Sequence, residues 1–321
     1  MMVFLRLATL LLVSTVLAAP AYALKILIGN DDGFGTANIR ALYHAAKQAG
    51  HDALIAAPVD NQSGTGATRR EPKPLQKDGG FGLVKAGSPA EGHDAKDDHV
   101  WYVNSTPVSS IAYGLEELCP RYFGSKPDLI LSGTNQGNNV GLSIYWSGTY
   151  NVARYAVEQG IPAIAFSAGN LTERAYTELG GPEDQANIYA AYAFQVVDQL
   201  LLHQQQQRHQ QSDVHHMLLP ESTGLNVNFP SAPKRGCRAE DTRFVLTRLL
   251  ANLERNPDAC TCGQQRSKGC KLPRESSVIR GDNGCTNTIS LFAPTTFSPD
   301  ASAYEQEQLL ETLSGFVSCL D

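Results

Sequence analysis

Short apolar segments alternate with helical periodicity between Lys25 and Pro230, and this alternation constrains the fold more than any other feature of the chain. Residues 26–28 and 53–57 are apolar runs of strand length, and apolar residues at helical spacing lie between them. The pattern continues with a helix that begins at Pro107, strands at 129–131 and 163–166, and a helix between these strands over about 149–159. Strand–helix–strand units of this kind build a parallel sheet covered by helices. The sequence therefore predicts an α/β fold with a mostly parallel sheet.

The first 23 residues have the features of a secretory signal peptide. Arg6 supplies the positive end, residues 7–17 are apolar, and Ala21-Tyr22-Ala23 forms a small-x-small cleavage site. The apolar stretch is shorter than the roughly 20 residues that a membrane span needs. We therefore predict an exported protein, periplasmic or secreted, that has no membrane contact after cleavage. An uncleaved N-terminal anchor is the alternative.

The net charge argues against a nucleic-acid polymer as partner. The formal charge is −6 at pH 7 and becomes −7 once Arg6 is removed with the signal peptide. A mildly acidic chain has no basic stripe with which to neutralise a row of phosphates. Small anions can still bind where a metal ion and backbone amides supply the positive potential.

The composition of the sequence changes after Pro230, where polar and cysteine-bearing segments replace the alternating pattern. We therefore expect two parts in the mature chain. Residues 24–230 form the α/β domain, a Rossmann-like three-layer sandwich, and residues 231–321 form a cysteine-rich extension that packs on this domain or reaches from it.

Six of the seven cysteines lie at or beyond Cys237. An oxidising compartment favours pairing, so we predict that disulfides staple the extension. Because seven is odd, at least one thiol stays free, and Cys119, which ends an apolar helical pattern, is the expected buried one. Zinc is the alternative for the cysteines between 260 and 285, but their spacing lacks the paired CxxC knuckles of common zinc modules.

Two segments lack a regular pattern. Residues 62–98 are rich in Gly, Lys and Asp, and we expect a long loop that acts as a lid or an oligomer contact. Residues 203–216 hold six glutamines and four of the eight histidines. We interpret this tract as a solvated helix end followed by a loop, with a histidine-rich metal site as the alternative.

The first polar motif, Asn30-Asp31-Asp32-Gly33, follows the first strand directly. It places two adjacent carboxylates at the carboxyl end of a central strand, where open α/β sheets bind ligands. Neighbouring carboxylates repel each other, and a cation between them removes that cost. Oxygen ligands favour Mg²⁺ or Mn²⁺ over softer metals. Taken alone, this motif is explained equally well by a plain turn.

Three further polar loops are expected at the same sheet edge. Residues 57–66 follow the second strand, and Gly64 and Gly66 allow a ligand to approach the backbone closely. Residues 132–141 follow a later strand, and their alternating glycines and asparagines can bind metal or phosphate without adding charge. Residues 147–149 begin a helix, whose free N–H groups and dipole favour a phosphate. Four such loops at one edge indicate a ligand site.

In this order, the four motifs resemble those of the SurE family of metal-dependent 5′/3′-nucleotidases, also described as acid phosphatases. The resemblance covers about residues 25–230 and includes 225–230 as a late core strand. By position, it implies metal ligands at Asp31, Asp32, Ser63 and Asn135. It also implies phosphate or substrate contacts at Asn139, Ser147, Gly148 and Thr149, with catalytic roles for Asp31, Asp32 and Asn139. It further implies a bound Mg²⁺ or Mn²⁺, nucleotides and similar small phosphate monoesters as substrates, and a homo-oligomer of two or four copies.

The chain departs from the family pattern at two places. Thr36-Ala37-Asn38 stands where the family commonly has an Ala-Pro-Gly turn, and the family's C-terminal segment is barely recognisable at 289–291. These differences concern the rim of the site, the oligomer arms and the substrate specificity more than the chemistry.

The expected reaction is in-line attack of a metal-activated water on a phosphomonoester. The motifs contain no histidine or cysteine, which argues against a phosphohistidine or phosphocysteine intermediate. Phosphorylation of Asp31 or Asp32 remains open. An exported binding protein without hydrolytic activity is the main alternative. A serine esterase is a second one, although the chain has no GxSxG elbow.

Overall fold

The computed structural model describes residues 23–210, 217–231, 237, 242–251, 257–281, 283–294 and 298–320. The predicted signal peptide, apart from residue 23, lies outside the described residues, as does the end of the histidine-rich tract after residue 210. Among the described helices, none is both long enough and apolar enough to span a membrane.

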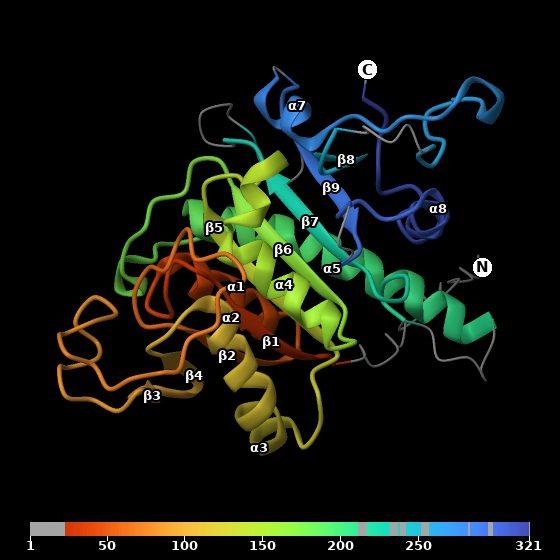
Figure 1. Cartoon of the computed structure of the whole chain (residues 1–321). Helices are drawn as coiled ribbons and strands as arrows, with labels where there is room; N and C mark the ends of the chain where they lie inside the picture. Colours follow the sequence, from red (N-terminus) through yellow and green to blue (C-terminus); the bar gives the residue numbers. More distant parts are fainter. Residues whose placement is uncertain are drawn as a thin grey trace, which may run out of the picture.

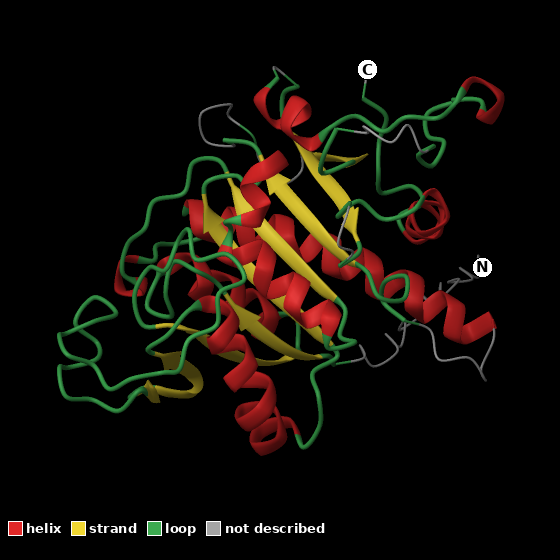
Figure 2. Cartoon of the chain, viewed as in Figure 1, coloured by secondary structure: helices red, strands yellow, loops and turns green. Residues whose placement is uncertain are grey.

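The described residues form a nine-stranded sheet in the order β3-β4-β2-β1-β5-β6-β7-β9-β8 (Figures 1 and 2). Neighbouring strands are parallel from β4 to β7, β3 and β9 run antiparallel to β4 and β7, and β8 runs parallel to β9. This topology confirms the predicted α/β class. The strands are β1 (Lys25–Gly29), β2 (Asp52–Pro58), β3 (Glu91–Asp94), β4 (Asp97–Val103), β5 (Leu129–Gln136), β6 (Ala163–Ala168), β7 (Gly224–Phe229), β8 (Arg243–Thr247) and β9 (Thr286–Phe292).

Helices cover both faces of the sheet, as the sequence predicted. One face packs against α1 (Ala37–Gln48), α5 (Gln185–Gln210) and α8 (Ala303–Thr312). The other packs against α2 (Pro107–Tyr113), η1 (Gly114–Leu118), α3 (Cys119–Phe123), α4 (Gly148–Glu158) and α7 (Glu275–Arg280). Successive residues of a strand point to opposite faces, so Ile26 and Ile28 enter one core and Leu27 the other. The central strands are therefore continuous apolar runs. Short helical turns lie at η2 (Gly141–Tyr145), η3 (Tyr176–Glu178) and η5 (Arg266–Lys268).

The extension after Pro230 contributes strands to this same sheet. β9 pairs with β7 on one side and with β8 on the other, and Leu309 and Leu313, in and just after α8, pack into the core beside α5. The extension is thus a structural continuation of the sheet (Figure 1). A division of the chain at residue 230 stays a prediction.

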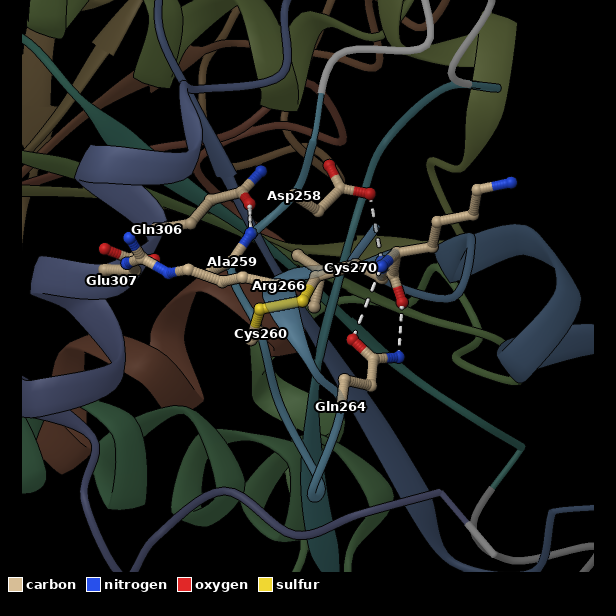
Figure 3. Close-up of a disulfide and its surroundings, with 10 residues drawn as sticks. Asp258, Ala259, Cys260, Gln264, Arg266, Cys270, Gln306 and Glu307 are labelled. Atoms are coloured by element: carbon tan, nitrogen blue, oxygen red, sulfur yellow. Dashed lines mark hydrogen bonds and ion pairs between the residues drawn. A yellow bond between two sulfur atoms is a disulfide. The ribbon is translucent and has the colours of Figure 1, made fainter. Parts of the chain in front are cut away.

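Three disulfides lie in the extension, as predicted, and they use the cysteines for which zinc was the alternative. The pairs are Cys237–Cys285, Cys260–Cys270 and Cys262–Cys319. Figure 3 shows the Cys260–Cys270 bond and the polar side chains around it. Cys119 is the buried free thiol, as expected.

The expectation of a loop over residues 62–98 is wrong at its C-terminal end. Glu91–Asp94 and Asp97–Val103 form the antiparallel pair β3–β4 at one edge of the sheet. β3 is a short, polar edge strand with a single buried residue, so it has no apolar run that could have revealed it. Between residues 63 and 90 the backbone forms turns and an isolated bridge between Gly79 and Val84.

The loops that the disulfides close differ in length, and this difference yields a prediction. Cys237–Cys285 spans 48 residues and Cys260–Cys270 spans 10. By loop entropy, replacing the longer pair by alanines should lower the free energy of unfolding by about 4 kcal/mol and replacing the shorter pair by about 3 kcal/mol. Guanidinium unfolding of the two double-alanine variants measures both values. A larger loss of unfolding free energy on replacing Cys260–Cys270 than on replacing Cys237–Cys285 would contradict the loop-entropy explanation.

Candidate active site

The four polar loops meet at the switch point of the sheet, where the strand order reverses between β1 and β5. Asp31 and Asp32 follow β1 directly, and both side chains are only 2% exposed. The loop after β2 reaches them through the amide of Gln62, which donates to the Asp31 carbonyl oxygen at 2.7 Å. Open α/β sheets bind ligands at this place. The structure therefore brings together the motifs that the sequence assigned to one edge.

The carboxylate of Asp31 lies at the N-terminus of α4. The Gly148 amide donates to one oxygen at 3.1 Å and the Thr149 hydroxyl to the other at 2.7 Å. The positive end of the helix dipole further favours a negative charge here. A Cβ on Gly148 would lie 2.7 Å from the Cβ of Asp31 and 2.7 Å from Cγ of Pro107, so only glycine permits this approach.

Ser147 caps α4, because its hydroxyl oxygen accepts from the Tyr150 amide at 3.0 Å. In this structure, the groups of Gly148 and Thr149 that were expected to contact phosphate hold Asp31 instead. Their contact with phosphate, and that of Ser147, stays a prediction.

Asp32 points toward the end of β5, where the Gln136 amide donates to its carboxylate at 3.1 Å. Burial raises the pKa of Asp31, and burial together with the charge of Asp31 raises the pKa of Asp32 further. Within the described part of the chain, neither carboxylate forms an ion pair with a lysine, arginine or histidine. Two buried carboxylates without a cationic partner are costly, and a bound cation removes this cost.

Asn135 completes a set of oxygen donors that fits a divalent cation. Its amide NH₂ donates to the carbonyl oxygens of Gln136 at 3.1 Å and Gly137 at 2.7 Å. The side-chain carbonyl oxygen of Asn135 is then the atom that it offers to a ligand. Carboxylate and amide oxygens are the donors that Mg²⁺ and Mn²⁺ prefer.

A bulge in β5 determines where Asn135 lies. The pairing of β5 with β6 shifts between Ser132 and Asn135, and Gly133 has a φ of 129°. A Cβ on Gly133 would lie 2.3 Å from the Phe166 carbonyl oxygen. Because no other residue fits, the glycine at this position belongs to the architecture of the site.

Ser63 lies in the loop after β2 and is exposed, unlike the other predicted metal ligands. Its amide donates to Oδ1 of Asn61 at 2.8 Å, and further along the loop the Gly66 amide donates to the Trp146 carbonyl oxygen at 3.1 Å. These bonds tie the loop to the residue that precedes Ser147. Ser63 thus belongs to the same edge, on its solvent side.

Asn139 is held by residues that the sequence analysis did not single out. Its carbonyl oxygen accepts from the side chains of Asn226 and Asn228, each at 3.0 Å. Its amide donates to Oδ1 of Asn228 at 3.0 Å, and its side-chain NH₂ donates to the Ser167 hydroxyl at 2.9 Å. Asn226 and Asn228 are two residues apart in a strand, so they share a face. Two asparagines on one face of the otherwise apolar β7 could have indicated from the sequence that this face is next to the site.

A second group of acidic and histidine side chains lies elsewhere. Ligand atoms of Asp97, Asp98 and His99 lie within 4.8 Å of one another. These residues begin β4, which is parallel to β2, so they lie at the opposite edge of the sheet from Asp31. They do not belong to the site described above.

The fold and the site together define an α/β protein with an acidic, oxygen-rich site at the switch point of an open sheet. The family model described as Survival protein SurE matches residues 26–255, and the chain belongs to the SurE family. The match confirms the family that the four sequence motifs indicated.

Relatives from distant organisms agree with this assignment. The chain is 32% identical to an acid phosphatase of Yarrowia lipolytica, over 91% of this chain and 85% of that protein. It is 30% identical to the 5′-nucleotidase SurE of Gloeobacter violaceus, over 91% of this chain and 100% of that protein. The crystal structure of the SurE protein from Aquifex aeolicus has the same fold, with a TM-score of 0.53 at 23% identity over 90% of this chain and 98% of that one. These findings confirm the predicted enzyme class, a phosphoric monoester hydrolase.

The Thr149–Asp31 hydrogen bond can be tested with a pair of matched variants. Thr149→Val keeps the shape of the side chain but leaves one oxygen of Asp31 without its donor, whereas Thr149→Ser keeps the hydroxyl. We expect Thr149→Val to lower kcat/KM for phosphate release about 10- to 100-fold, as loss of an orienting partner does, and Thr149→Ser to stay near wild type. Equal activity of the two variants would show that the hydroxyl does not orient Asp31.

Proposed function

We propose that this chain is an exported, divalent-metal-dependent hydrolase that releases phosphate from nucleoside 5′- or 3′-monophosphates. The observation that carries the proposal is the buried pair Asp31 and Asp32 at the switch point of the sheet, held by backbone amides and by Thr149 without a cationic side chain. The names of the matched relatives, acid phosphatase and 5′-nucleotidase, support the same reaction.

In this proposal, Asp31, Asp32, Ser63 and Asn135 hold Mg²⁺ or Mn²⁺. A bound ion of this kind lowers the pKa of a water molecule and neutralises charge on phosphoryl oxygens. The chain's own contribution is to fix these donors: α4 orients Asp31, the Gln136 amide orients Asp32, and the bulge at Gly133 places Asn135. Preorganised donors of this type need no rearrangement during the reaction.

Asn139, Ser147, Gly148 and Thr149 receive the phosphoryl group in this proposal. Asn139 is suited to this role because four hydrogen bonds from β6 and β7 fix its backbone and its amide. A neutral amide at this position binds phosphate without repelling it. The N-terminus of α4 adds favourable dipole potential for an anion.

The geometry also bears on which group attacks the phosphorus atom. Both oxygens of Asp31 accept hydrogen bonds, from Gly148 and from Thr149. A carboxylate that is engaged at both oxygens is a poor nucleophile, which favours attack by water over a phospho-Asp31 intermediate.

A nucleoside is favoured over a simple phosphate ester by the aromatic side chains beside α4. Trp146 directly precedes the helix cap and is 63% exposed, and Tyr145 before it is 48% exposed. Aromatic side chains that face solvent beside a phosphate site provide a surface on which a nucleobase stacks.

Export and oligomerisation are part of the same proposal. The three disulfides support an oxidising compartment. Phe81 and Leu83, at the tip of the long loop, are 50% and 41% exposed, which supports an oligomer contact over a lid. Light scattering on the purified protein measures the number of copies, and a monomer would contradict this part of the proposal.

The decisive experiment measures phosphate release from nucleoside 5′- and 3′-monophosphates with Mg²⁺, Mn²⁺ or EDTA. We expect activity with either metal, none in EDTA, and a loss of at least about 100-fold in Asp32→Asn, which removes a charged ligand but keeps its shape. Asp128→Asn, at the amino end of β5, is a matched control that should stay active. A wild type that binds nucleotides but hydrolyses none with any metal would establish the exported binding protein instead.

The stacking surface predicts a substrate-dependent defect. Trp146→Ala should raise KM for AMP about tenfold and leave KM for glycerol phosphate nearly unchanged, because only AMP has a base to stack. Trp146→Phe keeps an aromatic ring and should retain most of the affinity. If Trp146→Ala raised KM for AMP and KM for glycerol phosphate equally, the side chain would act on the phosphate site and not on the base.

A further inference from the structure

Glu275 is a fully buried carboxyl group that the cysteine-rich extension places next to the proposed phosphate loop. It is the first residue of α7 and lies outside the segment that the family model matches, residues 26–255. One of its oxygens accepts from the Gly141 amide at 3.2 Å, in the loop that contains Asn139. The other accepts from the side chains of Asn226 and Ser290, each at 3.0 Å.

Asn226 connects Glu275 to Asn139. Its side-chain NH₂ donates at 3.0 Å to Oε2 of Glu275 and at 3.0 Å to the Asn139 carbonyl oxygen, so both hydrogens are used. Oδ1 of Asn226 is buried and has no hydrogen-bond partner among the residues that the structure describes. An amide turned the other way would point this oxygen at two acceptors, the Asn139 carbonyl oxygen and Oε2 of Glu275. Glu275 and the Asn139 carbonyl oxygen therefore fix together which way the Asn226 amide faces.

The extension holds Glu275 through its own network. The Glu275 amide donates to the Arg248 carbonyl oxygen, and the Arg248 amide donates to the Pro273 carbonyl oxygen, both at 2.9 Å. The Arg248 guanidinium forms buried ion pairs with Asp258 and Asp300. Figure 3 shows Asp258 beside the Cys260–Cys270 disulfide, at the start of the segment that leads to α7.

We propose that Glu275 is a positioning residue for the hydrolase: through Asn226 and Gly141 it fixes the loop that presents Asn139 to the substrate phosphate. This inference rests on the proposed function. It assigns to the extension a direct part in shaping the site, beyond completing the sheet.

The ionisation of Glu275 suits this role. Burial, with a further contribution from the charge of Asp300, raises the pKa of Glu275 to about 8. The side chain is then mainly neutral at pH 7 and adds no negative charge beside the phosphate loop. In the neutral acid, Oε2 can carry the proton and donate it to the Ser290 hydroxyl oxygen, which reverses the direction of that one hydrogen bond and keeps the bonds that Asn226 and Gly141 donate.

Glu275→Gln tests the proposal because it matches the neutral acid in shape and charge. Glutamine can still accept from Gly141 and donate to Ser290, but its NH₂ group cannot accept from Asn226. We expect kcat for AMP to fall about tenfold or more at 25 °C, as when an orienting partner is removed, with a smaller change in KM. Glu311→Gln, on the exposed side of α8 in the same extension, is the matched control and should keep wild-type kcat. Thermal unfolding of each variant establishes that it is folded at 25 °C.

A double-variant cycle with Asn226→Ala separates positioning from general stability. If Glu275 acts through Asn226, the double variant Glu275→Gln/Asn226→Ala should be no less active than Asn226→Ala alone. Independent effects that multiply would overturn the proposal, as would a Glu275→Gln variant with wild-type kcat. A wild type that hydrolyses no phosphomonoester would contradict the proposed function itself, and this outcome is distinct from a failure confined to the Glu275 variants.

Discussion

The burial of two adjacent carboxylates at the switch point of the sheet is the constraint around which the site is arranged. Asp31 and Asp32 lose nearly all contact with water, and each loses hydration that the protein must replace. Backbone amides replace part of it, from the start of α4 for Asp31 and from the end of β5 for Asp32. This requires α4 to approach β1 very closely, which explains the glycine at position 148. The remaining deficit of positive charge is the property that suits the site to a bound cation.

The parts of the fold that local patterns encode were predictable. β1, β2 and β6 are buried on both faces, so they appear in the sequence as continuous apolar runs, and the polar loops that follow β1, β2 and β5 mark their carboxyl ends. β3 was missed because a short, polar edge strand has no such run. The pairing of β9 between β7 and β8 was also beyond prediction, because it depends on contacts between distant segments and not on a local pattern.

The same distinction holds within the site. Asp31 and Asp32 could be named because they follow a strand in a polar, glycine-containing loop. Asn135 was expected in a similar loop after residues 129–131, but it lies within β5, which continues past the bulge to Gln136. The hydrogen bonds from the start of α4 to Asp31 were not foreseen: the structure shows Gly148 and Thr149 bound to the carboxylate, and their expected contact with phosphate stays a prediction. Glu275 gave no signal at all, since it stands in a polar segment and contacts a loop 134 residues earlier in the chain. Only the assembled sheet brings these two segments together.

The strand order has a consequence for how the chain acquires its structure during synthesis. Among the described strands, β9 is the last to be made, yet it lies between β7 and β8 in the sheet. Until residue 292 has left the ribosome, β8 lacks its neighbour in the sheet and β7 presents an open edge to other chains. Co-translational folding can therefore complete the strands from β4 to β7 but not the sheet. The stage in which β9 inserts and Glu275 reaches the loop of Asn139 must wait until residue 292 has been made, and a product that terminates before β9 keeps an edge that is prone to aggregation.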